Sequence, residues 1–262
     1  MKALFIPLLF LSVFSTAQAV LSIDGAACNT HGSAKAGSNT YYLNAYKNRY
    51  TFPQATDFDK HITLKALLQS ADPNQFSPDK AVRLQGYVFN VKMGGVESCN
   101  CKTKNPAFRD THIELTPDET KTAPQYRLIA EVTPRLRALM SRKGEDWSTE
   151  GLRKTLRGRK VVITGWLLYD VEHEGEAFAN DPQDAIGGEN WRATCWEIHP
   201  ITNIEFLSAA SRMETDTANS SAPIDNVPPG QQPEERPGYP FLTVLLVLAV
   251  VLLVILYIRR RK

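Results

Sequence analysis

Apolar and polar residues alternate along several short segments in the middle of the chain, and such alternation is typical of β-strands. The first segment, residues 82–92, carries apolar groups on both faces, as a barrel strand packed on each side would. One of its faces holds Val82, Leu84, Gly86, Val88 and Asn90. Four more strands are predicted at residues 110–116, 126–133, 160–170 and 192–207, the last of them broken near Pro200.

Apolar residues at helical spacing predict short helices at residues 63–70, 135–142 and 149–156. The last two fall between the third and fourth predicted strands. Three strands, a helical connection and two more strands is the order of an OB-fold, a small five-stranded barrel. We therefore expect a mainly β protein with short helices and an OB-fold-like five-stranded barrel over residues 81–208, preceded by an N-terminal arm with one short helix over residues 20–80. A generic β-sandwich is the alternative.

The two ends of the chain have a different pattern. Residues 1–19 combine a cation, an apolar run and a final Ala-Gln-Ala, which together predict a cleaved secretory signal peptide. Residues 240–258 lack charge and predict a single C-terminal transmembrane helix, because 18 apolar residues span about 27 Å. The basic tail 259–262 is then cytoplasmic. Residues 209–239 are polar and rich in proline, which predicts a flexible linker. The domain is thus expected in the periplasm or outside the cell, anchored to the membrane.

The formal net charge of +2 comes from the two ends, and acidic and basic residues balance between positions 20 and 208. A globally basic nucleic-acid-binding protein is therefore not indicated. One local exception is the segment 135–160, where cations outnumber anions. It is interpreted as a solvated helical face, or alternatively as a patch for an anionic ligand or lipid headgroups.

Four cysteines, Cys28, Cys99, Cys101 and Cys195, would face an oxidising compartment if the chain is exported. Cys99 and Cys101 are poorly placed to bridge each other, so a disulfide from Cys28 to one of them is predicted. Which of the two it takes is left open. Metal coordination by this pair together with His112 is the alternative.

Five short motifs lie within the predicted domain. They are Lys-Asn-Arg at 47–49, Gly-Gly-Val-Glu-Ser-Cys-Asn-Cys at 94–101, Arg-Asp-Thr-His-Ile-Glu-Leu at 109–115, Glu-Val-Thr-Pro-Arg at 131–135 and Trp-Arg-Ala-Thr-Cys-Trp-Glu-Ile-His-Pro at 191–200. In these motifs the chain resembles a family of uncharacterised bacterial proteins, many of them exported, with an OB-fold-like domain. The resemblance covers residues 43–207 and supports one domain. It implies no catalytic residue, and the linker and membrane span lie outside it.

Polar residues alternate within two of the predicted strands. Asp110, His112 and Glu114 project to one face of their strand, and Cys195, Glu197 and His199 share a face of another. Glu131 ends the third strand. Barrel closure is expected to bring the following five residues together: His112, Glu114, Glu131, Glu197 and His199.

Two imidazoles with carboxylates suit a divalent metal such as zinc or manganese, and His112, His199 and Glu131 are the candidate ligands. A purely structural role, with the acids paired to neighbouring arginines, is the alternative. Trp196 is a further binding candidate through ring stacking, or else a core residue.

These features lead to three hypotheses about function. The first is a membrane-tethered extracytoplasmic binding module for an oligomeric ligand such as polysaccharide, peptide or nucleic acid. The second is a metal-dependent hydrolase, phosphodiesterase-like, that uses His112 and His199 with nearby carboxylates. The third is a scaffold of a membrane complex.

Overall fold

A computed structural model of the protein describes residues 21–180, 182 and 190–207. In this part of the chain, five strands close into a barrel in the order β3-β4-β5-β7-β6. Their bounds are β3 (Ala81–Met93), β4 (Thr111–Thr116), β5 (Leu128–Val132), β6 (Lys160–Tyr169) and β7 (Trp196–Phe206). β5 and β7 pair in parallel, and the other neighbours pair antiparallel. The predicted mainly β protein with a five-stranded barrel is confirmed.

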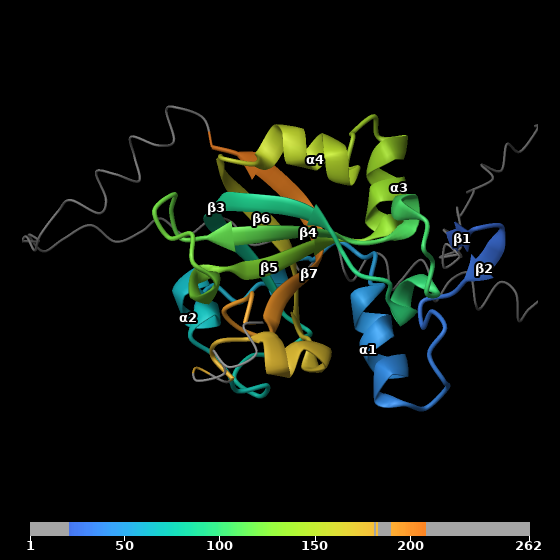
Figure 1. Ribbon diagram of the computed structural model, residues 1–262, viewed down its shortest axis with the longest axis horizontal. Coiled ribbons are helices and arrows are strands. Elements are labelled where there is room, and N and C mark those ends of the chain that lie inside the picture. The colour runs from blue at the N-terminus through green and yellow to red at the C-terminus, as the bar shows by residue number, and fades with distance from the viewer. Residues whose placement is uncertain (1–20, 181, 183–189, 208–262) are drawn as a thin grey trace, which may run out of the picture. The chain divides into compact units, whose positions relative to one another are not determined.

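The helices are short and lie around the barrel. Their bounds are α1 (Asn39–Lys47), α2 (Leu64–Leu68), α3 (Pro134–Arg142) and α4 (Thr149–Leu156). Short 3₁₀ segments lie between these elements at η1 (Ala55–Asp57), η2 (Ser98–Asn100), η3 (Pro106–Phe108), η4 (Pro124–Tyr126) and η5 (Val171–Glu176), the last of which is kinked at His173. Figure 1 shows α3 and α4 along one side of the barrel and α1 and α2 along the other. The three predicted helices are present, and Thr63, Thr133 and Ser148 cap them by accepting hydrogen bonds from backbone N–H groups.

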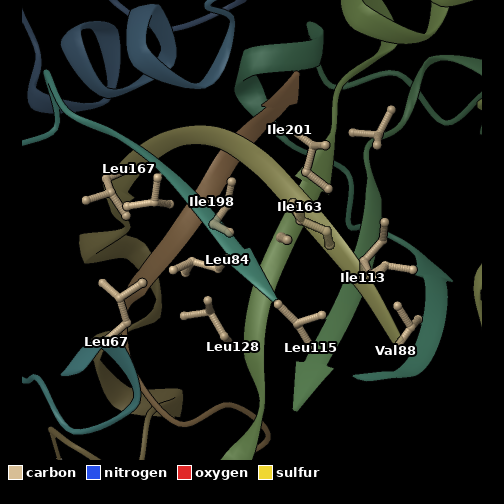
Figure 2. Packing of buried hydrophobic residues seen from close by; sticks show 14 of the residues in the cluster. Leu67, Leu84, Val88, Ile113, Leu115, Leu128, Ile163, Leu167, Ile198 and Ile201 are labelled. Atoms are coloured by element: carbon tan, nitrogen blue, oxygen red, sulfur yellow. The ribbon is translucent and has the colours of Figure 1, made fainter. Parts of the chain in front are cut away.

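The interior of the barrel is the hydrophobic core. Side chains from all five strands and from α2 converge there (Figure 2): Leu67, Leu84, Val88, Ile113, Leu115, Leu128, Ile163, Leu167, Ile198 and Ile201. Because side chains alternate across a strand, the residues between these point outward. On β4, β5 and β7 those outward residues include the predicted polar cluster.

Two expectations about the strands are wrong. In β3, Val88 pairs with Leu115 and Asn90 pairs with Glu114, so Phe89 is an extra, bulged residue. The bulge reverses the alternation, and Val91 rather than Asn90 turns into the core. In β7, Pro200 does not break the strand, which continues to Phe206 with register shifts against β6.

The N-terminal arm is more ordered than expected. Only one short helix was predicted in this arm, but a hairpin, β1 (Leu21–Ile23) with β2 (Ala26–Cys28), and the helix α1 precede it. The buried residues of α1 are polar, Asn44 and Lys47, so the sequence shows no apolar stripe that would reveal the helix.

A disulfide between Cys28 and Cys101 joins the arm to the loop before β4. It confirms the predicted bridge and shows that Cys28 pairs with Cys101 and not with Cys99. Cys99 and Cys195 are free and buried.

The predicted signal peptide, linker, transmembrane helix and basic tail all lie outside the described residues. Among the residues that the structure describes, no helix is both long and apolar enough to cross a membrane.

Candidate functional site

The polar cluster lies on the outer face of β4, β5 and β7. His112 of β4 and Glu131 of β5 are Cα partners in the antiparallel pair. The parallel pairing of Ala130 with Ile198 brings the next residue of each strand, Glu131 and His199, to the same level. Strand pairing alone therefore assembles these three side chains, as the sequence predicted, and Glu197 joins them through His199.

This outer face is covered by three segments that lie outside β4, β5 and β7. The loop before β4 contributes Glu97 and Asp110, α1 contributes Lys47, and the segment before β7 contributes Arg192 and Trp191. The ring of Trp191 stacks over His112 with centroids 6.0 Å apart. As a result His112 is 6% exposed and Glu131, Glu197 and His199 are at most 2% exposed.

His199 is held in one orientation by a buried chain of contacts. Its Nδ1 lies 2.9 Å from Oε1 of Glu197, and the other Glu197 oxygen lies 2.8 Å from the Arg192 guanidinium. Arg192 and His199 overcome the cost of burial and lower the pKa of Glu197. Nε2 of His199 is buried and has no hydrogen-bond partner in the described structure. This arrangement, an imidazole steadied by a carboxylate at one nitrogen, is typical of a metal-binding histidine.

His112 and Glu131 are close but do not form a hydrogen bond. Nε2 of His112 lies 3.1 Å from Oε1 of Glu131, yet both ring nitrogens of His112 lack a hydrogen-bond partner among the described residues. Burial lowers the pKa of His112, so the neutral ring with a free lone pair is favoured. Burial also raises the pKa of Glu131 well above its usual range.

Asp110 is a buried carboxyl group with no Lys, Arg or His within salt-bridge distance in the described structure. One oxygen accepts a hydrogen bond from the Asn100 amide at 2.7 Å, and the other has no hydrogen-bond partner. Burial raises the pKa of Asp110, with Glu97 adding to the effect. By contrast, Lys47 lies 2.9 Å from Glu97 and 2.7 Å from Asp170, and it holds the pKa of Glu97 at about 2 against the effect of burial.

Oxygen, nitrogen and sulfur atoms in this cluster lie at metal-binding distances. Three groups have ligand atoms within 4.8 Å of one another: Glu97–His112–Glu131, Asp110–Glu131–His199 and Glu97–Cys99–Asp110. The predicted trio of His112, His199 and Glu131 is not one of them, because the two imidazoles fall into different groups that share Glu131. Burial would lower the pKa of His199, but Glu131 and Glu197 raise it to about 9.

Two predicted site residues lie outside these groups. Glu114 shares the outer face of β4 but pairs with Lys92 at 2.8 Å and with Arg127 at 3.5 Å. Trp196 is fully buried in the core, where its indole N–H donates to the backbone of Asp72. It therefore offers no surface on which a ligand could stack.

The strand pattern gave no sign of Glu97 and Lys47, and it suggested Arg192 only as one of the arginines that could pair with the acids. All three lie in motifs that carry the resemblance to exported proteins, at 94–101, 47–49 and 191–200. Those motifs were the available signal, but nothing in their spacing predicts that α1 and two loops fold over the same strands.

Some cations of the basic segment 135–160 make hydrogen bonds within the protein. Arg135 donates to the backbone of Cys28 and Asn29, and Arg137 donates to the backbone of Ala107 and Trp147. These guanidinium groups hold the arm and the loop before β4 in place. An anionic ligand on the remaining exposed cations stays a prediction.

Comparison with known proteins adds no identification. No family model matches the chain, and the comparisons with curated proteins and with solved structures find no match either. The resemblance to exported bacterial proteins thus stays a prediction.

Proposed function

We propose that this chain is a membrane-tethered extracytoplasmic binding module, and that the ligand held directly by its barrel is a divalent metal ion. The observation that carries the proposal is a set of buried polar atoms without hydrogen-bond partners, contributed by Asp110, His112, Glu131 and His199. Leaving such atoms unpaired costs free energy, and native proteins rarely do so without a reason. A cation at their centre would satisfy them together.

The chemistry of the donors supports zinc or manganese. Carboxylate oxygens with imidazole nitrogens are ligands that both ions accept. The group Asp110–Glu131–His199 provides two carboxylates, and neither has a Lys or Arg partner within salt-bridge distance in the described structure. A divalent charge would compensate them, as Lys47 and Arg192 compensate Glu97 and Glu197 nearby.

The cover over the cluster favours a metal ion over an oligomeric ligand. The strand order, with α3 and α4 between the third and fourth barrel strands, supports an OB-fold-like barrel. In that fold an oligomer lies across the second and third strands, between the two loops that flank them. Here β4 and β5 are those strands, and α1, Glu97 and Trp191 cover their polar face. A small ion needs no open groove.

The proposed membrane tether and extracytoplasmic location are supported by the sequence and by the Cys28–Cys101 disulfide. The predicted signal peptide and transmembrane helix indicate export and anchoring. The Cys28–Cys101 disulfide is what an oxidising compartment would favour. A metal-binding module held near the outer surface of a membrane is consistent with all three features.

Metal analysis of the purified, detergent-solubilised chain tests the proposal. After removal of metal and incubation with zinc or manganese, we expect at least one tightly bound ion per chain, and we expect His199→Gln to weaken its binding by at least tenfold. His61→Gln is the matched control, since His61 is exposed and far from β7 in sequence. A wild-type chain that retains no ion at micromolar free metal would refute the proposal.

A further inference from the structure

The cluster contains more ligands than one ion can use. The groups Glu97–His112–Glu131 and Asp110–Glu131–His199 each supply one imidazole, and only Glu131 belongs to both. We propose that the cluster holds two divalent ions that share the carboxylate of Glu131. This inference rests on the proposed function, because it assumes that the cluster binds metal.

Distances argue against one ion held by both imidazoles. Zinc lies about 2 Å from its nitrogen and oxygen ligands, so two ligands of one ion are at most about 4 Å apart. Within the described residues, no group with ligand atoms inside 4.8 Å contains both His112 and His199. A single ion would therefore be bound by only one of the two buried imidazoles. With two ions, each imidazole binds one of them.

Glu131 is oriented as a bridge. Its Oε1 lies 3.1 Å from Nε2 of His112, and its Oε2 lies 3.6 Å from Nδ1 of His199. Oε1 thus faces the unpartnered Nε2 of His112, and Oε2 lies on the side of the His199 ring that Glu197 also holds. Paired ions in proteins lie about 3.5–4 Å apart, a separation that one bridging carboxylate spans.

The two sites differ in depth. Asp110 and His199 are each 1% exposed, so the ion they hold with Glu131 is enclosed by protein. In the other site the side chain of Glu97 is 16% exposed, and His112 lies directly beneath Trp191. We expect the inner ion to exchange slowly and the outer ion to exchange faster.

The third group, which contains Cys99, receives no ion in this assignment. It shares both of its carboxylates, Glu97 and Asp110, with the two imidazole groups.

Metal content per chain separates this inference from the proposed function. At saturating zinc or manganese, we expect two ions per wild-type chain and one ion in each of His112→Gln and His199→Gln. His61→Gln should keep two. One ion per wild-type chain overturns the two-ion inference and leaves the proposed function standing, whereas no ion overturns both.

Manganese electron paramagnetic resonance supplies a readout on the wild-type chain alone, in case a variant does not fold. Two Mn²⁺ ions that share Glu131 should give the broadened spectrum of an exchange-coupled pair. His112→Gln should restore the six-line signal of an isolated ion. If the wild-type spectrum at two equivalents of metal shows only isolated Mn²⁺, the inference that two ions share the Glu131 carboxylate is wrong.

Discussion

Nε2 of His112 and Oε1 of Glu131 lie 3.1 Å apart on paired strands without forming a hydrogen bond. An ordinary histidine–glutamate pair would turn its donor toward the acceptor, because the bond is strongest when nearly linear. Atoms that are close but misaligned are expected where both point at a third centre. The pairing of β4 with β5 thus supplies two ligands of the proposed metal site without help from any loop.

Metal removal should destabilise the domain. An ion that binds only the folded state at 100 times its dissociation constant adds about 2.7 kcal/mol to the free energy of unfolding. For a domain of this size that corresponds to a rise in melting temperature on the order of 5–10 °C. Thermal unfolding followed by circular dichroism, with a chelator and with added zinc or manganese, measures the shift. A melting temperature unaffected by the chelator in metal-loaded protein would contradict the prediction.

Replacement of Lys47 by Met should cost about 3–5 kcal/mol of stability, because it leaves Glu97 and Asp170 buried without their cation. Urea unfolding measures the loss. The double variant Lys47→Met/Asp170→Asn should lose less than the sum of its single changes. The matched control is Arg83→Ala, which removes an exposed ion pair with Glu205 and should cost at most about 1 kcal/mol. Equal losses in Lys47→Met and Arg83→Ala would count against a buried ionic role for Lys47.

Reduction of the Cys28–Cys101 disulfide should destabilise the domain. The bond closes a segment with a sequence separation of 73, for which chain entropy predicts a contribution on the order of 4 kcal/mol. The double variant Cys28→Ser/Cys101→Ser should unfold at lower urea concentration than the wild-type chain. It should also bind metal more weakly, because Cys101 lies in the loop that contributes Glu97 and Asp110.

Cys195→Ser is the control for the disulfide prediction, since Cys195 is free. Its unfolding midpoint should still fall when a reductant is added, as in the wild-type chain. A wild-type midpoint that does not change with reductant would show that the bond contributes little.

The barrel was predictable because its signals are local. Alternation along β4 and β5, the helical spacing at Leu64 and Leu67, and the caps Thr133 and Ser148 all act within a few residues. The bulge at Phe89 was not predicted, because apolar residues on both faces of residues 82–92 suggested one continuous strand, although the adjacent Val88 and Phe89 and the polar Asn90 interrupt the alternation there. It is set by pairing with β4, which is a tertiary property.

The site was predictable only as far as strand pairing determines it. His112, Glu131 and His199 come together through neighbouring strands. Lys47 enters the cluster from a helix whose buried face is polar, and Glu97 enters from a loop. Neither position carries a periodic signal, so the sequence pattern suggested a shared metal site but missed the charges that surround it.

Gly165 of β6 allows β7 to approach closely, and a larger residue there should destabilise the barrel. A Cβ at this position would lie 2.5 Å from the carbonyl oxygen of Pro200 and 3.0 Å from Cα of Ile201, which are backbone atoms that cannot turn aside. We expect Gly165→Ala to cost about 1–3 kcal/mol in urea unfolding. Gly175→Ala is the matched control, because no atom lies within 4 Å of its Cβ, and it should stay within about 0.5 kcal/mol of wild type. Equal stability of the two variants would refute the close approach of β6 and β7.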